Sequence, residues 1–414
     1  MKTILLMENQ KPPFNRRKFL TNAAKIAGVG AAGFIYMKGC NNEPSEVEPG
    51  PGNKHVFLTN PYLVTLESSK AYIRCITNLK AYSWVEYGET EKLTNKEHAT
   101  TNGLVNANTR IHEIELSDLK PGTTYYYRVA SKNIIEFQPY KVVYGETIYS
   151  KFYQFKTMDE QVAETSWLIL NDIHDVRGSY EHMIGLNKNE PFDYVFLNGD
   201  MYDDIENEDQ VIELMIKPCA ETFAAEKPMI FVRGNHDIRG KYAREMLNYF
   251  SFPKGPFFTY RHGPVFVIVL DTGEDKEDAA AVFAGLVDCE AFRKKQATWL
   301  ETVLQSDEYK NAPYKVVKMH IPTHYTTGGK GELHCRELFT PLFNQYKVDL
   351  VISGHTHKWG VYPPNDIHQY PLVIGGGPRT GARTLIKVKA NMQQLKLQML
   401  DDSGKQVGEY LIKR

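Results

Sequence analysis

The chain contains 414 residues, with 49 lysines and arginines against 50 aspartates and glutamates, so its formal net charge is −1. This balance gives no electrostatic reason to expect a nucleic-acid-binding surface. The length allows two or three domains of roughly 150 residues each, and a 12% aromatic content supplies sizeable cores and argues against overall disorder. Five cysteines form no Cys-x-x-Cys pair, which predicts neither a zinc ribbon nor a disulfide framework.

Residues 1–40 have the features of an export signal and not those of a folded element. Arg16 and Arg17 precede a Gly/Ala-rich run, residues 23–37, that is too short and too weakly apolar for a membrane span. The paired arginines, with a phenylalanine and a leucine shortly after them, resemble a twin-arginine export signal. We therefore expect an exported protein of the periplasm or cell envelope.

Cys40 ends this segment and is followed by a polar tether at residues 41–53. Gly39-Cys40 resembles a lipoprotein processing site, and a lipid on Cys40 would tether the mature protein to a membrane. Met37 and Lys38 depart from the apolar and small residues usual before such a cysteine. Plain signal cleavage nearby is therefore the alternative.

Residues 54–158 are predicted to be all-β. Strand-like runs bounded by turn residues occur at 62–66, 71–76 and 83–87. The Leu-x-Pro-x-Thr-x-Tyr pattern that ends at Tyr125 is followed by further tyrosines and resembles the tyrosine corner of a fibronectin-type sandwich. On this interpretation Trp84, Tyr125 and Cys75 lie in the core of the sandwich.

Residues 164–414 alternate strand-like and helix-like segments, which is the α/β pattern. Helices are predicted at 208–226, with an interruption near Pro218, and at 288–306 and 337–347. A hairpin is expected at 257–271. The predicted closing strands cover 384–389, 394–399 and 407–412.

Five short apolar runs in this region each end in residue types that bind metals. The residues that follow the runs are Asp172 and His174, then Asp200, then Asn235 with His236 and Asp237, then His320, and finally His355 with His357. A lone His-x-His pair would more often be two surface histidines. Because sites in open α/β sheets lie beyond the carboxyl ends of the strands, we expect the five loops to converge on one cluster.

In this order the five blocks resemble those of the calcineurin-like metallophosphoesterases, over residues 166–380. The preceding all-β segment resembles the N-terminal domain of purple acid phosphatases. The resemblance implies a four-layer α/β/β/α metallophosphoesterase sandwich preceded by an all-β fibronectin/Ig-like sandwich. It also implies a hydrolase whose partners are small phosphate-ester substrates, either monoesters or diesters.

The resemblance further implies two divalent metal ions, Fe, Mn or Zn, which suit mixed nitrogen and oxygen ligands. Two neighbouring ions need a shared carboxylate, and Asp200 is the expected bridge. By family analogy the first ion is held by Asp172, His174, Asp200 and His357, and the second by Asp200, Asn235, His320 and His355. A water shared by two cations would become a hydroxide nucleophile near neutral pH and attack phosphorus.

His236 is not counted among the ligands. The resemblance gives it a catalytic role, either contacting a phosphoryl oxygen or protonating the departing alkoxide. Asp237 is a second catalytic candidate, because a neighbouring carboxylate could orient His236. A helix N-cap is the alternative role for Asp237.

The first block departs from the purple acid phosphatase pattern. Those enzymes carry Asp-x-Gly there and a ligand tyrosine three residues after the bridging aspartate. This chain has His174 in the first block, and Asp203 stands three residues after Asp200. We therefore expect an imidazole in place of the tyrosinate. Tyr202 stands one position too early and is interpreted as a packing residue or a substrate contact.

Two further residues are candidate substrate contacts. His324 lies on the same predicted loop as His320, and a structural histidine is an equal alternative. Arg379 follows three glycines and Pro378 and could reach a phosphate group, against a structural role.

Two classes of function fit these observations. The first is an exported dinuclear-metal phosphoesterase. The second is a catalytically inert surface-binding lipoprotein that uses the β-sandwich. Every expected ligand position is filled, which favours the enzyme.

Overall fold

The computed structural model describes residues 54–414. The expected export signal and tether, with Arg16, Arg17 and Cys40, lie outside the described residues. Within residues 54–414, no helix combines the length and the apolar character that crossing a membrane requires. The four cysteines in this range, Cys75, Cys219, Cys289 and Cys335, are all buried and free.

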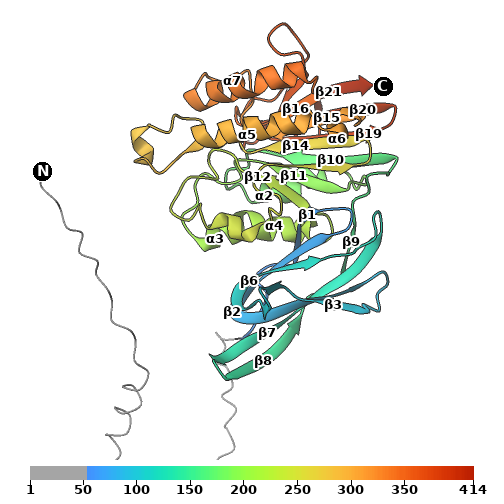
Figure 1. Ribbon diagram of the computed structural model, residues 1–414, viewed down its shortest axis with the longest axis vertical. Coiled ribbons are helices and arrows are strands. Elements are labelled where there is room, and N and C mark those ends of the chain that lie inside the picture. Colours follow the sequence, from blue (N-terminus) through green and yellow to red (C-terminus); the bar gives the residue numbers. More distant parts are fainter. Residues whose placement is uncertain (1–53) are drawn as a thin grey trace, which may run out of the picture. The chain divides into compact units, whose positions relative to one another are not determined.

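The N-terminal part folds as the predicted β-sandwich (Figure 1). Its strands are β1 (Tyr62–Leu66), β2 (Ala71–Gly88), β3 (Asn95–Glu97), β4 (Thr100–Thr101), β5 (Leu104–Val105), β6 (Ala107–Leu116), β7 (Thr124–Gln138), β8 (Lys141–Tyr149) and β9 (Tyr153–Lys156). The hydroxyl of Tyr125 accepts the N–H of Lys120 at 2.9 Å, which confirms the tyrosine corner. The core positions of Trp84, Tyr125 and Cys75 are confirmed as well.

The sequence predicted two strands where the structure has the single strand β2. Its pairing with β6 shifts register between Ile76 and Ala81 and again between Ala81 and Tyr82, and these irregularities absorb the polar residues between the two apolar runs. Turn-forming residues had suggested a break there, but the ladder continues across them.

The C-terminal part contains two sheets packed face to face. The first has β10 (Glu164–Leu170), β11 (Tyr194–Asn198) and β12 (Met229–Val232) in parallel, extended by antiparallel β19 (Thr384–Asn391), β20 (Gln394–Asp401) and β21 (Gln406–Lys413). The second has the order β13-β14-β15-β16-β18-β17, with bounds Phe258–His262, Val265–Leu270, Tyr314–Met319, Leu350–Ser353, Leu372–Ile374 and Gly360–Tyr362.

Helices cover the outer face of each sheet. The first sheet carries α2 (Gly178–Gly185), α3 (Glu208–Val211) and α4 (Lys217–Cys219), and the second carries α5 (Cys289–Leu304), α6 (Asp307–Lys310) and α7 (Lys330–Gln345). Successive side chains of β10 point to opposite faces of the first sheet. Trp167 and Ile169 pack between the sheets, whereas Leu168 and Leu170 pack against the helices. The predicted four-layer fold is therefore confirmed, and burial on both faces explains the continuous apolar runs.

Two predicted helices differ in detail. The segment expected at 208–226 is helical from Glu208 to Ala224 and contains the π-helical turns Ile212–Ile216 and Ala220–Ala224 on either side of Pro218, which cannot donate an N–H. The helix expected from residue 337 begins at Lys330. Glycines at 328, 329 and 331 hid its first turn from sequence reasoning.

The sandwich is joined to the first sheet by β1, which pairs antiparallel with β2 and parallel with β12. Arg74 of β2 reinforces this junction, forming an ion pair with Glu113 and donating to the carbonyl oxygen of Phe250 at 2.7 Å and to Ser251 Oγ at 3.2 Å. Because β12 leads directly into the Gly234–Asp237 loop, the sandwich supports a strand that carries predicted site residues.

Candidate functional site

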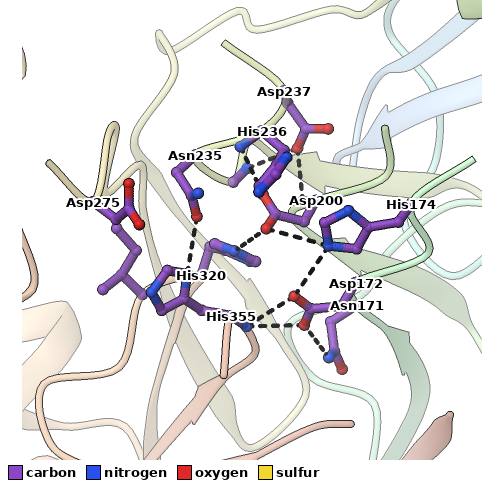
Figure 2. Close-up of polar contacts among 12 residues, drawn as sticks. Asn171, Asp172, His174, Asp200, Asn235, His236, Asp237, Asp275, His320 and His355 are labelled. Atoms are coloured by element: carbon purple, nitrogen blue, oxygen red, sulfur yellow. Dashed lines mark hydrogen bonds and ion pairs between the residues drawn. The ribbon is translucent and has the colours of Figure 1, made fainter. Parts of the chain in front are cut away.

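The five loops that follow β10, β11, β12, β15 and β16 meet at one edge of the two sheets. They bring together all the residues predicted as metal ligands: Asp172, His174, Asp200, Asn235, His320, His355 and His357. Figure 2 shows the side chains of His174 and His320 directed toward Asp200. This convergence was predicted because the strands are parallel and end at the same edge.

The first group of donors comprises Asp172, His174, Asp200 and His357. One ligand atom from each lies within 4.8 Å of the others. His174 Nε2 stands 3.0 Å from His357 Nε2 and 3.6 Å from Asp200 Oδ2. Two imidazole nitrogens and carboxylate oxygens that all point into one space form a donor set suited to a divalent transition metal.

The second group shares Asp200 with the first. His320 Nε2 lies 3.1 Å from Asp200 Oδ2, and His355 Nδ1 lies 2.9 Å from Asn235 Oδ1. His320 Nε2 is buried and has no hydrogen-bond partner in the described structure, whereas its Nδ1 donates to the carbonyl oxygen of Asn198 at 2.8 Å. An imidazole with one nitrogen satisfied and the other left facing a carboxylate fits a metal ligand.

Burial and charge determine how these groups hold protons. Burial would raise the pKa of Asp172, but hydrogen bonds with His174 and His357 keep it well below its usual range. Burial would lower the pKa of His174, but its hydrogen bond to Asp172 and the charge of Asp200 raise it to about 9. The pKa of His320 rises to about 10, because the charge of Asp200 outweighs its burial. Metal binding must release these protons, so we expect metal affinity to fall as the pH falls.

The backbone at the site is strained. Six non-glycine residues at the site have a positive φ: Asp172, His174, Asp175, Asp200, His355 and His357. L-residues rarely adopt this conformation, and such strain concentrates where a surrounding structure fixes functional groups.

Gly234 leaves the space that Asp200 occupies. A Cβ at this position would lie 2.1 Å from Asp200 Oδ1 and 2.5 Å from the Asp200 nitrogen. We predict that Gly234→Ala displaces the shared carboxylate and weakens metal binding by at least ~10-fold, the lower end of the range for disturbed ligand support. Metal content after dialysis checks this. Gly185→Ala is the control, because nothing lies within 4 Å of that added Cβ. Wild-type metal content in Gly234→Ala would contradict the prediction.

His236 stands beside the donor groups. Its ring centroid is 4.7 Å from that of His174. Its Nδ1 donates to the carbonyl oxygen of Asp203 at 2.7 Å, and Nη1 of Arg239 donates to its Nε2 at 3.0 Å. Burial lowers the pKa of His236, and the charge of Arg239 lowers it further. Because Nδ1 is engaged by the Asp203 carbonyl, Nε2 is the ring nitrogen that can exchange a proton.

The structure does not place Asp237 in the expected orienting role. Its carboxylate accepts backbone N–H groups of Asp200 at 2.8 Å, Met201 at 2.9 Å and Gly234 at 2.7 Å. It does not cap a helix either, since no helix begins there in the described chain. Asp237 instead fixes the loop of Asp200 to the loop of His236, and Asp203 and Arg239 make the contacts with the His236 ring.

Asp203 contacts His174, the residue expected to replace the ligand tyrosine of purple acid phosphatases. Its Oδ1 lies 2.7 Å from Nδ1 of His174, whose Nε2 faces the first donor group. The position at which purple acid phosphatases carry the ligand tyrosine therefore supports the substituted imidazole. The sequence identified the exchange but not this contact.

The candidate substrate contacts are less well placed. Tyr202 is fully buried and donates to the carbonyl oxygen of Val211 at 3.1 Å, so it is a packing residue and not a substrate contact. His324 is 6% exposed, and its Nδ1 lies 3.1 Å from Thr323 Oγ1. This favours its structural alternative. Arg379 is exposed, and its backbone carbonyl oxygen accepts the N–H groups of Ala382 and Arg383.

Sequence reasoning overlooked three residues at the site. The amide of Asn171 donates to Asp172 Oδ2 at 2.6 Å and to the carbonyl oxygen of Gly376 at 2.8 Å. Arg239 contacts His236, and Glu332 contacts His355. Only the proximity of Asn171 and Arg239 to the predicted motifs could have indicated them. Glu332 lies in a different part of the sequence.

Comparisons with known proteins agree with both halves of the structure. The family model described as calcineurin-like phosphoesterase matches residues 166–359, and that of the purple acid phosphatase N-terminal domain matches residues 64–157. Purple acid phosphatase 21 of Arabidopsis thaliana is 25% identical over 69% of this chain and 62% of its own length. Purple acid phosphatase of Glycine max is 25% identical over 68% of this chain and 59% of its own length. The chain thus spans about three fifths of these relatives.

Solved structures give the same fold. Purple acid phosphatase PPD1 of yellow lupin (Lupinus luteus) superposes with a TM-score of 0.65 at 17% identity, covering 86% of this chain and 74% of the lupin chain. A structure titled PhoD gives 0.61 at 13% identity, covering 86% of this chain and 89% of its own. Residues 166–359 therefore form a calcineurin-like phosphoesterase domain, and residues 64–157 form a purple acid phosphatase N-terminal domain.

Proposed function

We propose that this protein hydrolyses phosphate monoesters or diesters at a site that holds two divalent metal ions. The observation that carries the proposal is the shared position of Asp200, whose carboxylate belongs to both donor groups at the ends of the parallel strands. A carboxylate common to two cation sites is what a paired-metal hydrolase requires. The purple acid phosphatase relatives support the same class of substrate.

Asp172, His174 and His357 would hold one ion together with Asp200, and Asn235, His320 and His355 would hold the other. The mixture of nitrogen and oxygen donors suits Fe, Mn or Zn. When bound, the ions would lower the pKa of the attacking water and stabilise the charge on the phosphoryl oxygens.

The protein's own contribution to the reaction centres on His236 and Arg239. The Asp203 carbonyl holds a hydrogen on Nδ1 of His236, so Nε2 is the nitrogen that would take up a proton from solvent and pass it to the leaving group. Arg239 is anchored by Glu274 at 3.0 Å and Asp275 at 2.9 Å, and its Nη1 reaches Nε2 of His236. A fixed guanidinium beside the proton-exchanging atom would attract a phosphoryl oxygen.

A direct test uses protein reconstituted separately with Zn²⁺, Mn²⁺ and Fe²⁺. Hydrolysis of p-nitrophenyl phosphate and of bis(p-nitrophenyl) phosphate would show monoester and diester activity, and we expect at least one of the two. A reconstituted protein with two ions per chain that hydrolyses neither would contradict the proposal. It would favour the inert surface-binding protein instead.

The ligand at position 174 predicts the colour of the protein. The purple of purple acid phosphatases comes from a tyrosinate bound to Fe(III), and here Tyr202 is buried with its hydroxyl on Val211. We expect an essentially colourless protein, and Tyr202→Phe should keep the wild-type metal content. His174→Ala should deplete the first ion more than the second. An intense purple preparation that bleaches in Tyr202→Phe would show that the ligand assignment is wrong.

We also propose that the protein is exported and tethered through Cys40, on the evidence of the twin arginines and of Gly39-Cys40 in the sequence. Fractionation of cells expressing the full chain should place it in the cell envelope. Arg16→Lys with Arg17→Lys should retain it in the cytoplasm, and Cys40→Ala should release it from membranes. Cytoplasmic wild-type protein would contradict both parts.

A further inference from the structure

Glu332 lies in the first turn of α7 and is 3% exposed. One oxygen of its carboxylate, Oε1, stands 2.9 Å from Nε2 of His355. The other, Oε2, accepts the backbone N–H groups of Gly328 and Gly329, each at 2.6 Å. A buried carboxylate satisfied in this way by fixed partners is held in one orientation.

Its histidine partner has a different neighbour at each ring nitrogen. Nδ1 of His355 lies 2.9 Å from Asn235 Oδ1, and Nε2 faces Glu332. An ionised carboxylate can only accept, so the hydrogen must be on Nε2. In a neutral imidazole this leaves the Nδ1 lone pair on the side of Asn235, another of the residues expected to bind the second ion.

We propose that Glu332 is a positioning residue for the second metal ion, acting through His355. It fixes both the tautomer and the ring orientation, so that Nδ1 is presented as the ligand. The inference rests on the proposed function, because it concerns the same pair of ions. The five sequence motifs that predicted the metal ligands do not include this glutamate.

The start of α7 is itself anchored, so the carboxylate does not move freely. The N–H of Gly331 donates to the carbonyl oxygen of Asp275 at 2.8 Å. A Cβ at Gly331 would lie 2.3 Å from the carbonyl oxygen of Glu274. This close approach requires glycine and seats the helix on the loop that also anchors Arg239. Glu332 therefore reaches His355 from a fixed base, as a support for a metal ligand must.

The test compares Glu332→Gln with Glu337→Gln, an exposed glutamate on the same helix. Metal-free protein is titrated with Zn²⁺ in competition with a chromophoric chelator, which resolves two binding equivalents. A glutamine cannot accept from both His355 and the two glycines. We expect Glu332→Gln to weaken one equivalent by ~10–100-fold, the usual effect of losing such a support. In Glu332→Gln the affinity of the other Zn²⁺ equivalent should match that of wild type. In Glu337→Gln the affinities of both equivalents should match.

A second readout separates positioning from simple helix capping. In ¹⁵N-histidine-labelled, Zn²⁺-loaded protein, the Nε2–H signal of His355 should be present in wild type and in Glu337→Gln. In Glu332→Gln it should be shifted or lost. Thermal unfolding of the metal-free proteins shows whether the substitution also damages the fold.

Two outcomes would overturn the inference. One is a Glu332→Gln protein that binds both equivalents as wild type does. The other is equal weakening of both equivalents with a lowered Tm and an unchanged His355 signal, which would make Glu332 a helix cap only. If wild type itself fails to bind two Zn²⁺ ions, the proposed function fails and not this inference alone.

Discussion

Asp200→Asn should remove most of the bound metal and reduce hydrolysis by at least ~10²–10³, the range for loss of a principal electrostatic group. The carboxylate of Asp200 lies 3.1 Å from His320 Nε2 and 3.6 Å from His174 Nε2, so it serves both donor groups. An amide is neutral and offers only one acceptor atom, so it bridges two cations poorly. Metal analysis and an aryl phosphate assay on the same samples measure both effects.

The matched control is Asp204→Asn, which removes an exposed carboxylate from the same loop. It should retain wild-type metal content and rate, because a charge in solvent contributes little to a buried site. An Asp200→Asn protein with two ions per chain and near-normal turnover would show that Asp200 is not the bridge.

His236→Ala should reduce turnover by ~10²–10⁴ while leaving two ions bound, because general acid–base loss affects the chemical step and not the ligands. The loss should be greater for an alkyl phosphate than for p-nitrophenyl phosphate. A poor leaving group needs a proton, whereas p-nitrophenolate departs without one. Turnover of both substrates and metal content are measured on the same protein.

The control is His182, an exposed histidine whose Nε2 lies 2.7 Å from the carbonyl oxygen of Asp402, and His182→Ala should behave as wild type. Loss of metal in His236→Ala would show that this residue is a ligand. Equal losses for the two substrates would assign it to phosphoryl contact and not to protonation of the leaving group.

Most of the candidate metal site could be predicted because its information is local. An apolar run followed within a few residues by Asp, Asn or His marks the end of a buried strand, and parallel strands end at the same edge. The exchange of tyrosine for His174 was inferred from the resemblance to purple acid phosphatases and not from the strand pattern. The four layers follow from strands that are apolar on both faces.

The errors concern contacts between segments that are distant in the sequence. Asp237 was expected to orient its neighbour His236, but its oxygens meet the N–H groups of Asp200 and Met201 on another loop. Glu332 reaches His355 from 23 residues away, which no spacing rule connects. The pairing of β1 with β12 joins segments more than 160 residues apart in the sequence, and their residue types gave no sign of it.

The central claim is that hydrolysis depends on two ions held by these loops. Its most direct test measures metal per chain and phosphate ester hydrolysis together, in purified protein, after chelation and after metal is restored. We predict close to two ions per chain, loss of metal and activity together, and recovery of both. Full hydrolysis by protein shown to be metal-free would contradict the account.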